Sequence, residues 1–119
     1  MGMTKVTMNI ANPARPSKKI TLEFLVDSGA AYSVVPRTVL NQLGIKPESK
    51  ESFFLANGEM VTRKIGNALF QYQRRERAAP VIFGEKGDSN LLGVVTLEAL
   101  GFVLDPFRRE LKPMPMFLM

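Results

Sequence analysis

The most informative part of this chain is Phe24-Leu25-Val26-Asp27-Ser28-Gly29-Ala30-Ala31, an apolar run that ends in one carboxylate and continues with small residues. Aspartate is depleted in strands and costly to bury, so its position at the end of a strand-like segment is unusual. Gly29 allows a sharp turn or a close approach of another chain. The segment predicts either a strand that ends in an ordinary Asp-Ser-Gly turn or a loop that presents Asp27 as an acid or base.

Alternating apolar residues predict a hairpin that leads to Asp27. Residues 4–10 place Val6, Met8 and Ile10 on one side, and residues 19–26 alternate in the same way. Residues 12–17 contain two prolines and predict the turn between the two strands. Further strands are expected at residues 33–35, 52–56, 59–65, 66–73, 80–83, 102–104 and 110–112, with a polar linker at 46–51, a helical turn that starts at Pro36 and is capped by Gly44, and a helix at 95–100 capped by Gly101.

Two further motifs follow the aspartate. Asn57-Gly58 lies between two strand-like runs and is the strongest short signal for a hairpin. Leu91-Leu92-Gly93 precedes the expected helix at 95–100. The sequence therefore predicts a mostly β chain with one projecting hairpin and a short helix near its end.

The composition limits the chemistry that the chain can perform. Its 119 residues, 45% of them apolar, fit one domain that spans residues 1–119. The chain has no cysteine and no histidine. Disulfides, thiol chemistry, Ser-His and Cys-His nucleophile systems and the usual zinc ligands are therefore excluded. Any hydrolytic chemistry must depend on carboxylates, lysine or tyrosine, and we expect no metal and no other cofactor.

The net charge of +5 comes from 16 basic and 11 acidic residues. A basic balance is compatible with nucleic-acid binding, but the basic residues are scattered and are not interleaved with aromatic residues. We expect a solvated basic face and no nucleic-acid partner. No apolar run approaches the roughly 20 residues of a membrane helix, and residues 1–5 carry no apolar signal segment. We therefore expect no membrane partner and a cytoplasmic location.

Together, these motifs resemble those of the retropepsin-like aspartic proteases. Asp27-Ser28-Gly29-Ala30 resembles the active-site loop of that family, and Leu91-Leu92-Gly93 with the helix ending at Leu100-Gly101 resembles its later segment. The resemblance runs from about Met8 to about Pro113. It implies an all-β fold, the retropepsin-like β-barrel, with one or two short helices and one lobe per chain.

The resemblance also implies roles for individual residues. In that family the aspartate is catalytic, the hydroxyl residue after it braces one loop against the other, and the glycine permits their approach. The Asn57-Gly58 hairpin lies where the family places its flap, which closes over a bound peptide. The implied site residues are catalytic Asp27, the loop residues Ser28, Gly29 and Ala30, the flap residues Ala56, Asn57, Gly58 and Glu59, and the supporting residues Leu92 and Gly93.

A single Asp-Ser-Gly loop supplies half of the groups that the chemistry needs. Peptide hydrolysis without a metal or a covalent nucleophile needs one carboxylate to take a proton from water and a second acid to protonate the substrate. Asp88 and Asp105, beside glycine and proline, look like turn residues. We therefore expect a homodimer in which each protomer supplies Asp27, acting on a peptide or protein. The family implies a dimer interface at the chain ends, at residues 3–7 and 114–119.

Two alternatives remain open at this point. The same fold could serve as a non-catalytic peptide-binding or scaffold domain, with its two Asp27 loops too far apart to share a water. A basic nucleic-acid-binding β-domain is the other alternative, and it is supported by net charge alone. The chain also departs from retroviral members at Val94, where they often carry an arginine, so the ion pair of that arginine is absent.

Overall fold

A computed structural model describes residues 3–115 of the chain. Its first two strands, β1 (Lys5–Asn12) and β2 (Arg15–Val26), form an antiparallel hairpin in which Lys5 lies opposite Leu25. Alternation buries one face of β1 in the core. The turn between the strands contains only Pro13 and Ala14, so β2 begins earlier than the predicted strand at 19–26. This hairpin delivers Asp27 to the end of β2.

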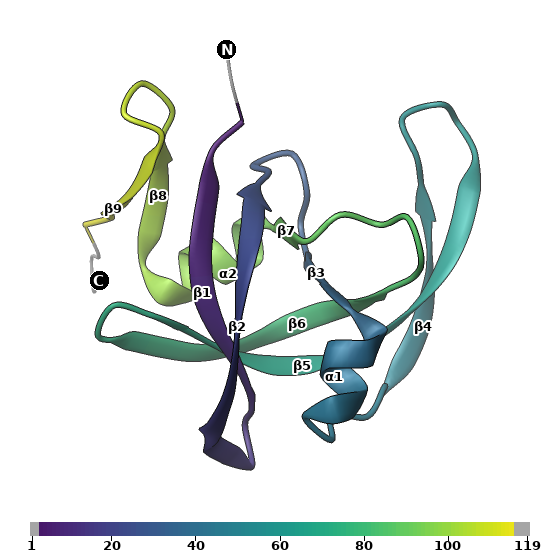
Figure 1. Cartoon of the computed structure of the whole chain (residues 1–119). Coiled ribbons are helices and arrows are strands. Elements are labelled where there is room, and N and C mark those ends of the chain that lie inside the picture. Colours follow the sequence, from purple (N-terminus) through teal and green to yellow (C-terminus); the bar gives the residue numbers. More distant parts are fainter. Residues whose placement is uncertain (1–2, 116–119) are drawn as a thin grey trace, which may run out of the picture.

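The other strands of the main sheet are β3 (Ser33–Pro36), β4 (Ser49–Phe54), β5 (Met60–Tyr72), β6 (Arg75–Gly84) and β7 (Leu91–Leu92). Their order is β1-β2-β7-β3-β6-β5-β4, and β1 also pairs with β5. The second pairing closes six strands into a barrel and leaves β4 at the outer edge of β5 (Figure 1). The pairs β2–β7 and β3–β6 are parallel.

Two short helices and a small second sheet complete the described chain. They are α1 (Arg37–Gln42), α2 (Val94–Leu100), β8 (Phe102–Asp105) and β9 (Glu110–Pro113). Gly44 and Gly101 follow the helices with φ of 75° and 80°. Glycine adopts this left-handed conformation without the steric cost of a Cβ, which confirms the predicted helix ends. Within residues 3–115, no helix is long and apolar enough to cross a membrane.

The core fills the barrel and extends beneath α2. The rings of Phe24 and Phe70 are both almost fully buried, and their centroids lie 6.4 Å apart. Leu97 and Leu100 of α2 are buried and belong to this core. Each large apolar side chain that is fully buried stabilises the fold by roughly 1.5–3 kcal/mol relative to exposure. This packing fixes the strands on both sides of the loop that carries Asp27.

Two further strands, β4 and β6, begin earlier than the sequence pattern predicts. β4 begins at Ser49, inside the predicted linker, because Ser49 pairs with Ile65. β6 covers ten residues rather than 80–83, because Arg75 to Ala79 also pair with β5. Exposed charged side chains in that segment conceal the alternation. Of the predicted interface at the C-terminal end, residues 116–119 lie outside the described part of the chain.

Candidate active site

The loop after β2 forms a compact turn around Asp27. The backbone N–H of Asp27 donates to the carbonyl of Leu92 at 3.0 Å, and the N–H of Ala30 donates to the carbonyl of Asp27 at 3.1 Å. Asp27 Oδ1 accepts a hydrogen bond from the N–H of Gly29 at 2.9 Å. A carboxylate that accepts from the backbone two residues later forms an Asx turn. Asp27 is half-buried, and its side chain position is set by its own loop.

The start of α2 supports this loop from the other side. The N–H groups of Val94 and Val95 donate to the carbonyls of Ala30 and Ala31 at 2.8 and 3.0 Å. Only glycine fits at position 93, because a Cβ there would lie 2.5 Å from the Ala31 carbonyl oxygen. The fully buried Leu92 and the adjacent Gly93 therefore contact the active-site loop mainly through their backbone.

A buried pair of hydroxyls lies behind the loop. Ser33 Oγ accepts a hydrogen bond from the N–H of Gly93 at 3.0 Å and lies 2.5 Å from Thr96 Oγ1. Both side chains are fully buried. This pair was not predicted from the sequence. The available signal was a threonine at a core-facing position of α2, next to Leu97.

The predicted flap is the hairpin formed by β4 and β5. Its tip is closed by hydrogen bonds from Leu55 N–H to the Glu59 carbonyl at 2.7 Å and from Gly58 N–H to the Leu55 carbonyl at 2.9 Å. Gly58 has φ of 89°, which favours glycine. Asn57 Oδ1 accepts from the N–H of Glu59 at 2.9 Å. These contacts explain why Asn-Gly is found at the turn.

A cleft of about 690 Å³ lies between this hairpin and the Asp27 loop. Of the residues expected at the site, Asp27, Gly29 and Ala30 line the cleft, whereas the exposed Ser28 and the tip residues 56–59 do not. The walls are largely apolar. They include side chains that are not among the site residues expected from the sequence: Leu25, Tyr32, Val34, Phe53, Phe54, Leu55, Val61, Ile82 and Leu91.

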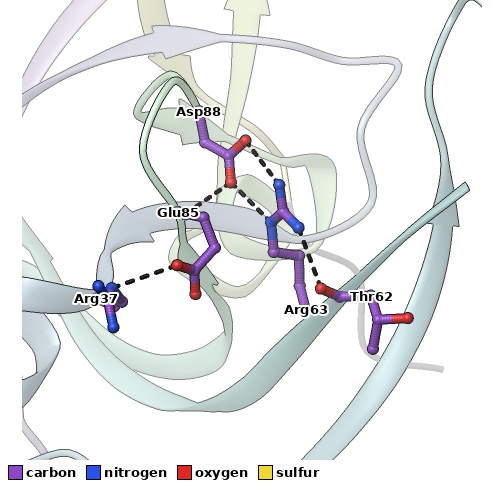
Figure 2. Close-up of polar contacts among 5 residues, drawn as sticks. All are labelled: Arg37, Thr62, Arg63, Glu85 and Asp88. Atoms are coloured by element: carbon purple, nitrogen blue, oxygen red, sulfur yellow. Dashed lines mark hydrogen bonds and ion pairs between the residues drawn. The ribbon is translucent and has the colours of Figure 1, made fainter. Parts of the chain in front are cut away.

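One ion pair interrupts these apolar walls. Arg63 of β5 and Asp88 of the loop between β6 and β7 both line the cleft and bind each other through two hydrogen bonds (Figure 2). The bond from Arg63, assisted by the Glu85 backbone N–H and opposed by desolvation, lowers the pKa of Asp88 below its usual value of 3.8. The bond to Asp88 raises the pKa of Arg63. Asp88 is in a turn, as predicted, but it is also part of a long-range pair.

The described cleft therefore contains two carboxylates in different environments. Asp88 is held in an ion pair, whereas Asp27 interacts with the backbone of its own loop. Within residues 3–115, no group of three or more histidine, cysteine, aspartate or glutamate side chains is placed to hold a metal ion. Among the described residues that line the cleft, Asp27 is thus the one carboxylate without an ion-pair partner in that part of the chain.

Comparisons with known proteins agree with this geometry. Residues 6–95 match the sequence profile of a family described as aspartyl protease. A search of curated proteins found no match. The similar solved structures include a retropepsin-like aspartic protease from Rickettsia conorii, with a TM-score of 0.53 and 20% sequence identity, over 88% of this chain and 90% of that one. At this identity the likeness concerns the fold, which is all-β and retropepsin-like.

Proposed function

Because this chain belongs to the aspartyl protease family and has a retropepsin-like fold, we propose that it is an endopeptidase. Two Asp27 carboxylates, one from each protomer of a homodimer, activate the water that attacks the peptide bond. The observation that supports this proposal most directly is the position of Asp27. It lines an apolar cleft of about 690 Å³, and its loop is held by backbone hydrogen bonds to β7 and α2.

In the proposed reaction, Asp27 takes a proton from the attacking water, and the protonated Asp27 of the partner subunit gives its proton to the substrate carbonyl oxygen. The new carbon–oxygen bond forms as the carbonyl π bond breaks, which gives a tetrahedral diol. The protonated Asp27 then gives its proton to the leaving nitrogen. One hydroxyl of the diol gives its proton to the ionised Asp27 of the partner subunit, and the carbon–nitrogen bond breaks. The two carboxyl groups finish with one shared proton, as at the start.

The number of available acids supports a homodimer. Asp88, the other carboxylate in the cleft, is bound to Arg63. In the proposed enzyme the second acid comes from another copy of the chain, and a two-fold axis beside the loop would bring two Asp27 side chains together. A permanent interface of this kind buries roughly 2,000 Å² or more.

The walls of the cleft indicate the class of substrate. Phe53, Leu55 and Val61 of the hairpin line the cleft from one side, and Ile82 and Leu91 line it from the barrel. An extended peptide segment with largely apolar side chains would bury apolar surface against both walls. We therefore propose that the enzyme cleaves extended, mainly apolar segments of peptides or proteins.

The test compares peptide-library cleavage by the wild type and by Asp27→Asn between pH 4 and 7. Asparagine keeps the oxygen that accepts from the Gly29 N–H, so the turn survives while the acid is lost. Removal of an essential acid–base group lowers activity by about 100-fold or more. Asp105→Asn is the matched control, because Asp105 Oδ1 accepts from the N–H groups of Phe107 and Arg108 in a turn outside the cleft.

Cleavage by the wild type and the control, but not by Asp27→Asn, would support the proposal. Equal cleavage by all three would identify a contaminating protease and contradict it. A wild type that sediments as a monomer at micromolar concentration would also contradict it. An inactive dimer that still binds apolar peptides would instead identify a peptide-binding domain.

A further inference from the structure

The outer part of the β4–β5 hairpin stands away from the barrel. β5 pairs with β6 from Ile65 to Tyr72, whereas its residues from Met60 to Lys64 pair only with β4 in the described chain. Figure 1 shows this hairpin rising from one side of the barrel. At its base the chain is tightly packed, because a Cβ on the buried Gly66 would lie 2.9 Å from the Lys46 carbonyl oxygen. The hairpin is therefore firmly fixed at its base and extends outward.

One side chain ties the projecting part back to the barrel. Arg63 Nε donates to Asp88 Oδ2 at 2.8 Å, and Arg63 Nη2 donates to Asp88 Oδ1 at 3.1 Å (Figure 2). Within residues 3–115, no other side-chain hydrogen bond links residues 49–64 to the rest of the chain. The two side chains are 19% and 28% exposed. A two-pronged pair with this degree of burial is stronger than a typical surface ion pair.

The Asp88 end of this pair is itself well anchored. Asp88 Oδ2 also accepts from the N–H of Glu85 at 2.8 Å, and the N–H of Asp88 donates to the Glu85 carbonyl at 2.9 Å. These bonds involve the backbone of Glu85, whereas its exposed side chain forms a separate ion pair with Arg37 of α1, in which Oε1 lies 3.3 Å from Nε (Figure 2). The same loop leads into β7, whose Leu92 carbonyl accepts from the N–H of Asp27. The Arg63–Asp88 pair thus connects the hairpin to the loop before β7, the strand that holds the Asp27 loop.

We propose that Arg63 and Asp88 are positioning residues that hold the β4–β5 hairpin at a set distance over the cleft. This inference deepens the proposed function and depends on it. The pair acts through Phe53, Leu55 and Val61, which the hairpin contributes to the cleft wall. Without the pair, the hairpin samples more positions, and substrate must select the productive one. Apparent affinity then falls in proportion to the population of that position, while turnover of the bound complex changes little.

The test measures KM and kcat for Asp88→Asn, Arg63→Gln and the double variant. We expect KM to rise about fivefold to tenfold and kcat to stay within about twofold, as the population argument requires. The double variant should be no worse than either single variant, because both singles remove the same interaction. Arg63→Lys keeps the charge but not the fork, and should lie between the wild type and Arg63→Gln.

Arg37→Gln is the matched control. It removes an ion pair to the same loop, but the side chains of Arg37 and Glu85 are 60% and 42% exposed, and neither residue lines the cleft. We expect its KM and kcat to match those of the wild type. If Arg63→Gln does not fold, as judged by circular dichroism, Arg63→Lys and Asp88→Asn still test the proposal.

Hydrogen exchange of the amides in residues 50–62 separates this inference from the proposed function. Asp88→Asn should speed exchange there, and Arg37→Gln should not. Equal exchange in all variants would overturn the positioning role, even if the wild type cleaves peptides. Faster exchange with an unchanged KM would overturn it too, because the position of the hairpin would not matter to substrate. A wild type that cleaves nothing would refute the endopeptidase, and exchange alone would then decide whether the pair holds the hairpin.

Discussion

Ser33 and Thr96 illustrate how the loop of Asp27 is stabilised by residues distant from the carboxylate. Their hydroxyls lie 2.5 Å apart, and Ser33 Oγ also accepts from the N–H of Gly93. All three groups are buried, so none can exchange its partner for bulk water. Gly93 in turn packs against the carbonyl of Ala31, so the two hydroxyls fix the loop through the backbone at position 93.

We predict that Ser33→Ala lowers the free energy of unfolding by about 1–3 kcal/mol, because it leaves the buried Gly93 N–H and the Thr96 hydroxyl without their partner. Urea unfolding at fixed protein concentration measures the change. Ser52→Ala is the control, since Ser52 makes a 3.4 Å contact with Thr62 on the exposed surface of the hairpin. Its cost should stay within about 0.5 kcal/mol. Equal losses in the two variants would show that the buried network does not stabilise the loop.

At the scale of elements, the hairpin of β4 and β5 marks the limit of what the sequence predicts. Asn57-Gly58 identified the turn, because these residue types suit a tight turn between strands. The alternation of Val6, Met8 and Ile10 likewise predicted β1. These signals are local. Phe53 and Val61 line the cleft because of the orientation of the hairpin relative to the barrel. Short-range periodicity does not determine that orientation.

Side-chain pairs between distant elements could not be predicted from the sequence either, because the signals in the sequence are local. Arg63 and Asp88 lie 25 residues apart. From the sequence alone, Arg63 is interpreted as an exposed strand residue and Asp88 as a turn residue. The pairing of Ser33 with Thr96 spans 63 residues. Only the folded chain brings these groups together. The position of Asp27 was predictable because the strand before it and the glycine after it are adjacent in the chain.

The Arg63–Asp88 pair also predicts a pH dependence of stability. The bond from Arg63 lowers the pKa of Asp88 in the folded chain, so ionised Asp88 stabilises the fold at pH values above its usual pKa of 3.8. This contribution is lost as the pH falls through the lowered pKa of the folded state. Asp88→Asn should therefore be less stable than the wild type by about 1 kcal/mol at pH 6. The difference should shrink as the pH falls below 3.8. Chemical unfolding from pH 2 to 6 measures it, and a constant difference would exclude the carboxylate as its cause.

At the scale of the whole molecule, the barrel is one lobe with one Asp27 loop. Rigid support of that loop by β7 and α2 means that two copies can present their carboxylates in a reproducible geometry. A site shared between two identical chains has a kinetic signature that a site within one chain lacks. Its activity depends on how the chains pair, and it responds to inactive copies.

We therefore predict that Asp27→Asn chains inhibit the wild type by pairing with it. If chains pair at random and one Asp27 is not enough, activity per wild-type chain equals the fraction of wild-type chains in the mixture. An equal amount of Asp27→Asn should then reduce activity to about half, and a ninefold excess to about a tenth, after the chains have exchanged partners. The measurement is the initial rate of peptide cleavage at a fixed wild-type concentration, well above the dimer dissociation constant. The same excess of an unrelated inert protein is the control for crowding and dilution. Activity that does not change with added Asp27→Asn would show that each chain carries a complete site, and the shared carboxylate pair would be refuted.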